Sequence, residues 1–135
     1  NLFHICELAE KMENNGNKIE LVKCENGNQS LCYYSLGNYL STQKGGLSML
    51  EGMAFVTFHI AEDRNYIDYD KSGVYPLVCQ YTRSPVRFER TYYLSEYTEE
   101  LAKAHGIHSY GGVNLKLEDL QTWSQEIFGD WDLSQ

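Results

Sequence analysis

The sequence predicts an α+β fold, a strand-rich sheet with an N-terminal helix and two C-terminal helices. Helical periodicity marks both ends of the chain, whereas the middle alternates apolar and polar residues and is rich in β-branched and aromatic types. The strands are grouped together instead of alternating with helices, which excludes repeated βαβ units. With 135 residues, 42% of them hydrophobic, the chain can form a single domain with one core.

The first element is an amphipathic helix. Apolar residues recur at helical spacing from Leu2 to Met12, and charged residues occupy the other side. The polar run 14–17 follows, and Gly16 suits a left-handed helix cap. We expect the helix to end there.

A β-hairpin is predicted next. Residues 19–24 and 31–36 are short extended runs, and Asn26-Gly27 lies in the turn between them. Asn-Gly between strand-like runs is the strongest short-range hairpin signal. Residues 41–46 are polar and glycine-rich, which predicts a loop.

The middle of the chain predicts four further strands, with turns at residues 63–65 and 71–73. Pro76 cannot donate a backbone hydrogen bond, so it predicts an edge strand or an irregular strand start. The expected strands are residues 53–61, 66–69, 74–81 and 87–93.

Two helices close the chain. The first is predicted to begin at Ser95 and end at Gly106, and a glycine-rich connection, residues 108–114, follows it. The second has an apolar stripe from Leu117 to Phe128 and is capped by Gly129. Its Trp123, like Trp131 beyond it, is expected to pack in the core or at its rim.

Charge and cysteine content limit the function classes. The chain has 11 Lys+Arg against 19 Asp+Glu, a net charge of −8, which argues against nucleic acid or an anionic membrane as a partner. No segment has the apolar length that membrane insertion requires. The four cysteines lack zinc-knuckle or redox spacing, and this favours thiols over a disulfide. They are Cys6, Cys24, Cys32 and Cys79.

Catalytic and metal-binding motifs are not evident. His105 and His108 flank Gly106 at a predicted helix end, where a cationic side chain interacts favourably with the helix dipole. We prefer that explanation to metal binding, which needs three or four converging ligands. Asp63, Asp68 and Asp70 lie in predicted turns and on the rims of predicted strands, where solvated acids are the expected interpretation. The sequence therefore predicts no catalytic residue, no metal ligand and no cofactor in this chain.

Residues 33–43 contain the strongest candidate for a binding site. A strand leads into Gly37-Asn38, and a polar loop then ends at Gln43. The Asn38 and Gln43 amides can donate and accept hydrogen bonds, and loops at strand ends often carry site residues. The alternative is an ordinary strand end at which Asn38 caps a turn.

The stretch from Ile19 to Gln43 resembles the end of the catalytic domain in bacterial CapA-type proteins, the poly-gamma-glutamate capsule biosynthesis family. This family is related to calcineurin-like metallophosphoesterases. The resemblance rests on Glu20, on the run Tyr34-Ser35-Leu36-Gly37-Asn38-Tyr39, and on Gln43. Residues 92–101 are also similar to the tail of some members.

The resemblance implies that the chain is the trailing part of a metallophosphoesterase-like α/β sandwich in a longer parent protein. Residues 1–43 would end the catalytic region, and residues 44–135 would form a C-terminal module. The implied substrate-binding residues are Ser35, Asn38, Gln43 and Glu20.

The family's His-Pro-His motif is replaced here by residues 12–18, which contain no histidine. The divalent metal is therefore expected only in the intact parent, whose N-terminal catalytic region would be this chain's partner and would supply the ligands. The alternative is that this copy of the family's site is degenerate. The implied function is that of the C-terminal part of a CapA-like protein, without catalytic activity of its own. The resemblance also implies a membrane-anchored parent at the bacterial cell surface or outside the cell.

A second hypothesis is a non-enzymatic interaction or accessory domain. The chain has an acidic composition and 11 tyrosines, which could form a surface that holds a partner subunit. Exposed sheet edges would also leave homo-oligomerisation or strand exchange open.

Overall fold

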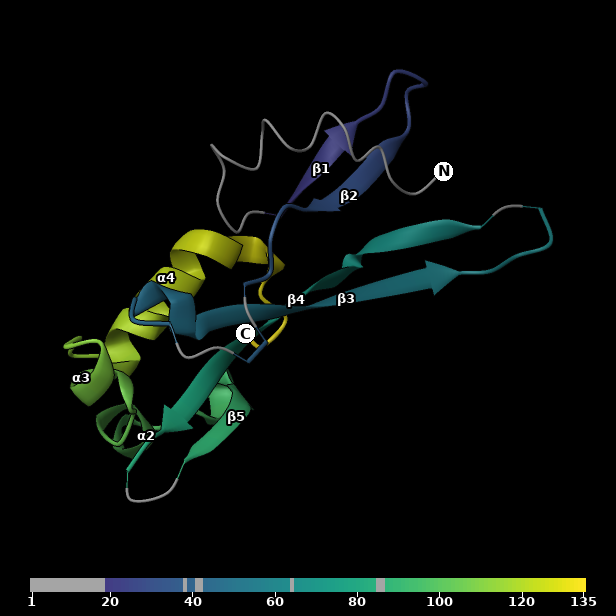
Figure 1. Cartoon of the computed structure of the whole chain (residues 1–135). Helices are drawn as coiled ribbons and strands as arrows, with labels where there is room; N and C mark the ends of the chain where they lie inside the picture. The colour runs from purple at the N-terminus through teal and green to yellow at the C-terminus, as the bar shows by residue number, and fades with distance from the viewer. Residues whose placement is uncertain (1–18, 38, 41–42, 64, 85–86) are drawn as a thin grey trace.

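The computed structural model describes residues 19–37, 39–40, 43–63, 65–84 and 87–135 (Figure 1). It confirms the α+β fold class. A two-stranded antiparallel sheet is formed by β1 and β2, and a three-stranded antiparallel sheet has the order β3-β4-β5. The predicted helix at residues 2–12 lies outside the described residues.

The elements follow one another with short connections, and the strands precede the helices. In chain order they are β1 (Ile19–Lys23), β2 (Gln29–Tyr33), the 3-10 turn η1 (Leu47–Met49), β3 (Leu50–His59), β4 (Tyr66–Thr82), β5 (Phe88–Tyr93), the 3-10 turn η2 (Leu94–Glu96), α2 (Glu99–Lys103), α3 (Ile107–Tyr110), α4 (Leu117–Phe128) and the 3-10 turn η3 (Gly129–Trp131).

The predicted hairpin is confirmed. β1 and β2 pair from Ile19↔Tyr33 to Lys23↔Gln29. The Cys24 N–H donates to the Asn28 carbonyl at 2.8 Å, and Gly27 has φ +81°, the conformation that Asn-Gly turns need. The second strand ends at Tyr33 instead of Leu36 because the chain leaves the hairpin there and crosses to the larger sheet.

The predicted turn at residues 71–73 is wrong. β4 is one strand of 17 residues and runs through it. The register shifts between Phe55↔Gly73 and Thr57↔Asp68, so residues 69–72 bulge opposite Val56. The buried Ser72 hydroxyl donates to the Asp68 carbonyl at 2.6 Å and accepts from the Thr57 N–H at 3.0 Å. Turn-forming residues here make a bulge, and a side chain replaces the missing ladder bonds.

β4 is the middle strand of its sheet, so Pro76 does not mark an edge strand. Pro76 pairs with Gly52 of β3, and the pairing with β5 begins one residue later, at Leu77↔Tyr93. Proline therefore lies where β4 has a strand neighbour on one side only, which limits the cost of its missing N–H.

The core forms where α4 packs on the sheet. Leu120 and Phe128 of α4 are buried in one cluster with Val74 and Val78 of β4. The approach is close at Gly52, where an added Cβ would lie 2.8 Å from Val74 and 3.1 Å from Phe128. As predicted, the two tryptophans pack against this core, and both are partly buried. They are Trp123 and Trp131.

The region of the first C-terminal helix differs from its prediction. α2 begins after Thr98, whose side chain accepts the Leu101 N–H at 3.3 Å, and Ser95 belongs to the preceding 3-10 turn. Thr98 is the better cap because its hydroxyl reaches an N–H group of the first turn. The glycine-rich connection contains the short α3, Ile107–Tyr110.

His105 is not the cationic helix end that the sequence predicts. The ring is buried, its Nδ1 accepts the Ile107 N–H at 2.9 Å, and its Nε2 therefore carries the proton that it donates to the Cys79 carbonyl at 2.8 Å. Burial lowers the pKa of His105 and keeps the ring neutral. The Gly106 N–H likewise donates to the Tyr81 carbonyl at 2.7 Å. His105 and Gly106 therefore provide hydrogen-bond donors for carbonyls of β4 that lie past the last residue paired with β3, Val78.

Beyond the core, β3 and β4 project as a two-stranded arm, here defined as residues 53–63 and 65–73 (Figure 1). The β1–β2 hairpin is joined to it by tyrosine hydroxyls. Tyr33 donates to the Gly73 carbonyl at 3.1 Å, and Tyr69 donates to the Gln29 carbonyl at 2.7 Å. The two sheets are therefore linked by hydrogen bonds from side chains.

The connection between the sheets passes very close to β3. The Gly52 N–H donates to the Leu36 carbonyl at 2.7 Å. Gly37 has φ +80°, and a Cβ on it would lie 3.0 Å from the Leu50 carbonyl oxygen and 3.2 Å from Glu51 Cα. Both the backbone conformation and the close approach require glycine at this position.

We expect Gly37→Ala to destabilise the protein more than Gly27→Ala. Gly27 has φ +81° with nothing within 4 Å of an added Cβ, so its substitution costs only the left-handed conformation, about 1 kcal/mol. Gly37→Ala adds a clash with backbone atoms and should cost about 1–3 kcal/mol more. Denaturant unfolding of the two variants measures the difference, and equal losses would contradict the close approach to β3.

Candidate functional site

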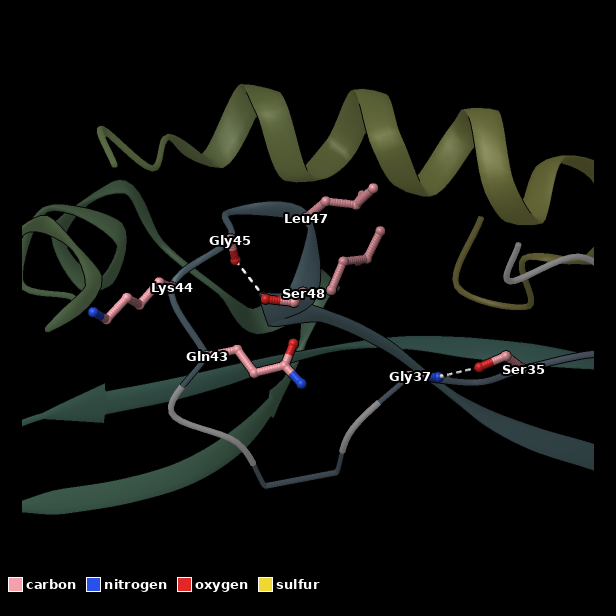
Figure 2. A pocket seen from close by; sticks show the side chains of 8 residues that line it. Ser35, Gly37, Gln43, Lys44, Gly45, Leu47 and Ser48 are labelled. Carbon is pink, nitrogen blue, oxygen red and sulfur yellow. Dashed lines mark hydrogen bonds between the residues drawn. The ribbon is translucent and has the colours of Figure 1, made fainter. Parts of the chain in front are cut away.

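An open hollow of about 550 Å³ lies beside the start of β3 (Figure 2). One wall is the segment that leaves the hairpin, and the other is the loop that leads into η1. We call this feature the hollow, and its lining consists of Ser35, Gly37, Gln43, Lys44, Gly45, Leu47, Ser48 and Leu50.

The loop wall is held from several directions. The Ser48 hydroxyl donates to the Gly45 carbonyl at 2.6 Å, and the Tyr81 hydroxyl of β4 donates to the Gln43 carbonyl at 3.2 Å. Gly46 sits so close to α4 that an added Cβ would lie 3.2 Å from the Trp123 ring. The loop is therefore fastened to β4 and α4.

The structure brings two of the four sequence-predicted residues together. Ser35 and Gln43 both line the hollow, and the Gln43 side chain extends from its loop toward the segment that carries Gly37 (Figure 2). Asn38 lies outside the described residues. Glu20 is not part of the lining; it accepts a hydrogen bond from the Tyr34 hydroxyl, which raises the pKa of that phenol. The substrate-binding roles of all four stay predictions.

The lining can bind a polar ligand by hydrogen bonds and charge. It offers the hydroxyls of Ser35 and Ser48 and the Gln43 amide, whereas the Lys44 side chain extends away from Gln43 and Ser48, and its ammonium nitrogen lies over the Tyr110 ring (Figure 2). The described lining contains no carboxylate, although the chain has 19 acidic residues. These groups suit the binding of a polar or anionic molecule.

Glu51 is a buried acid that the sequence reasoning missed. It is 1% exposed, and neither carboxylate oxygen has a hydrogen-bond partner of ordinary geometry among the described residues. Burial raises the pKa of Glu51 to about 7. A hydrogen bond with the Cys79 thiol lowers this pKa, but its effect is smaller than that of burial. The available signal was an acid inside the apolar run from Met49 to Met53, but the strand was expected to begin only at Met53.

Asp68 is not simply a solvated acid, because its side chain is largely covered and has two partners. It lies in β4, where its Oδ2 is 2.9 Å from His59 Nε2 and 3.3 Å from Lys71 Nζ. The hydrogen bond from His59, together with Lys71, lowers the pKa of Asp68. This polar cluster lies on the arm, and the His59 ring stacks on Tyr66 with centroids 4.7 Å apart.

Within the described ranges, no group of three His, Cys, Asp or Glu side chains is placed to hold a metal ion. Three of the four cysteines are described, and they form no disulfide, in agreement with the prediction of thiols; these are Cys24, Cys32 and Cys79. None of the helices in the described part of the chain has the length and apolar character needed to cross a membrane.

Comparisons with known proteins identified no related protein. No protein-family model matches the chain, and neither a curated protein nor a solved structure was found to match it.

We expect Glu51 to make stability depend on pH. Its pKa is raised in the folded protein, so folding is favoured below the ordinary carboxyl pKa and loses this contribution as pH rises to about 7. The loss should be on the order of 3 kcal/mol. Glu51→Gln should remove it, so the difference in unfolding free energy between wild type and variant should change between pH 4.5 and pH 8. Parallel profiles in denaturant titrations would contradict a protonated, buried Glu51.

Proposed function

We propose that this chain is the C-terminal part of a CapA-type protein of capsule or poly-gamma-glutamate biosynthesis, and that the hollow binds substrate in the intact parent. The observation that carries the proposal is the convergence of Ser35 and Gln43 on one hollow. These residues belong to the run on which the family resemblance rests.

The geometry of that run supports the proposal. Tyr34 is buried, Leu36 is hydrogen-bonded to β3, and Gly37 occupies a position that only glycine fits. The structure therefore explains why each of these three residues is needed at its position. Together they fix the backbone on both sides of Ser35, which lines the hollow. Residues that fix a loop next to residues that face a ligand are a common arrangement in binding sites.

In this proposal the chain supplies binding and the parent supplies chemistry. Phosphoesterase-type metal centres stabilise charge on oxygen and generate a metal-bound hydroxide. The ligands for such a centre would come from the parent's N-terminal catalytic region, and the hollow would orient the substrate next to it. The proposal carries with it a bacterial cell-surface location and a membrane-anchored parent.

We expect Gln43→Ala in the intact parent to lower kcat/KM about tenfold, because one hydrogen bond to the substrate would be lost. The melting temperature should change little, since the backbone carbonyl of Gln43, which Tyr81 binds, is retained. Gln121→Ala, an exposed glutamine on α4, is the matched control and should leave turnover unchanged. Wild-type turnover in Gln43→Ala would remove the hollow from the substrate site.

A second candidate function is association through the arm, which the exposed apolar side chains favour. Phe58 is 57% exposed and Ile60 87% exposed. The Tyr75 ring contacts the rings of Phe55 and Tyr93 with centroids 5.9 and 6.0 Å apart, so aromatic side chains cross all three strands of the sheet.

The partner that best fits the arm is a second copy of the chain. In the described part of the chain, β3 pairs with β4 alone, so beyond Gly52, whose N–H binds the Leu36 carbonyl, its outer edge has no strand partner. Two identical edges can pair antiparallel about a two-fold axis. Residues 52–60 contain no lysine, proline or acid that would block such pairing.

Under this candidate we expect the chain to form a dimer whose population rises with concentration. Phe55→Lys, which puts a charge on the arm, should shift it to monomer. Tyr39→Lys changes an exposed aromatic residue outside the arm and should leave the dimer intact. Size-exclusion chromatography with light scattering measures both, and a wild-type chain that stays monomeric at high concentration would rule this candidate out.

A further inference from the structure

Two cationic side chains share one aromatic ring at the rim of the hollow. The Lys44 ammonium nitrogen lies 4.9 Å from the centroid of the Tyr110 ring, and the Arg83 guanidinium carbon lies 3.7 Å from the same centroid. Lys44 also belongs to the lining of the hollow. The three residues are 39 and 27 positions apart in sequence, and only the fold brings them together.

The backbone positions of this cluster are fixed by separate elements. The carbonyl of Lys44 packs against α3, since an added Cβ on Gly111 would lie 2.7 Å from it. Arg83 directly follows the last residue of β4, and Tyr110 is the last residue of α3. The Gly106 N–H binds the Tyr81 carbonyl at 2.7 Å and so joins α3 to β4.

No ion pair among the described residues balances the charges of the cluster. The ion pairs among the described residues involve Lys71, Arg87, Lys103 and His59, and neither Lys44 nor Arg83. A ring face attracts a cation but does not cancel its charge, so the positive charge of each side chain remains available to a ligand. In a chain of net charge −8, two cations placed together without an acid suit a bound anion.

A single cation on a ring occurs elsewhere in the chain without these features. The Arg90 guanidinium carbon lies 4.7 Å from the Tyr92 ring centroid. No second cation shares that ring among the described residues, and Arg90 does not line the hollow. This pair shows what ordinary packing of arginine on tyrosine looks like in the same fold.

We propose that Lys44 and Arg83, gathered on Tyr110, bind an anionic oxygen group, a carboxylate or a phosphate, at the rim of the hollow. The planar arginine can hold two oxygens of such a group, and the lysine adds a point charge. The rest of the ligand would extend from this rim past the Lys44 backbone toward the hollow, of whose lining Lys44 is part. The inference rests on the proposed function in one respect: it takes the bound anion to be part of the substrate that the hollow binds.

The test uses the 135-residue chain and two probes, inorganic phosphate and glutarate, in low-salt buffer. Backbone amide NMR shifts should change saturably at Lys44, Arg83 and Tyr110 for at least one probe, and the stronger probe identifies the anion source. Binding should weaken with added salt. The variant Lys44→Gln/Arg83→Gln should weaken it tenfold or more, whereas Arg90→Gln, the matched control, should leave it unchanged.

Either of two results would overturn the inference: no saturable shift with either probe, or equal weakening in the double variant and in Arg90→Gln. Far-ultraviolet circular dichroism checks that each variant folds, and Lys44→Gln alone replaces the double variant if that one does not. Failure here is distinct from failure of the proposed function. If the chain binds the anion but Gln43→Ala keeps full turnover, the proposed function is rejected. If the chain binds no anion but Gln43→Ala loses turnover, the anion site is rejected.

Discussion

The fold depends on the pairing of β4 on both of its edges. β3 pairs with one edge and β5 with the other, and α4 packs on the buried stretch that contains Val74 and Val78. Tyr81 extends this role to the candidate site. Its carbonyl accepts the Gly106 N–H, and its hydroxyl donates to the Gln43 carbonyl. One residue of the central strand therefore holds both the segment that leads into α3 and the loop of the hollow.

Those parts of the fold that short-range chemistry decides could be predicted from the sequence. Asn26-Gly27 predicts the hairpin because its turn conformation is local, and the stripe from Leu117 to Phe128 predicts α4 because its period is that of a helix. The turn at residues 71–73 could not be predicted correctly. Its residues favour a turn, but strand pairing on either side keeps the chain extended, and the Ser72 hydroxyl satisfies the displaced backbone groups. His105 likewise depends on a partner, the Cys79 carbonyl, 26 residues away.

The candidate site also has a part that the sequence could predict and a part that depends on the fold. Ser35 and Gln43 follow from a continuous sequence motif, but their common hollow depends on how closely Gly37 approaches β3. Glu51 escaped prediction because the strand in which it is buried begins at Leu50, three residues before the predicted start. The cluster of Lys44, Arg83 and Tyr110 draws on three separate elements, so no local pattern could reveal it.

The electrostatics of the hollow follow from where the acids are absent or neutral. A chain with a net charge of −8 repels anions on average, so an anion site needs a local exception. The described lining has one lysine and no carboxylate, and Arg83 stands beside it on the Tyr110 ring. Glu51, next to the wall at Gly37, is an acid that burial keeps largely protonated below pH 7. Because this acid is neutral below pH 7, it adds no negative charge next to that wall, and this is the condition under which a carboxylate or phosphate would prefer the hollow to the remaining surface.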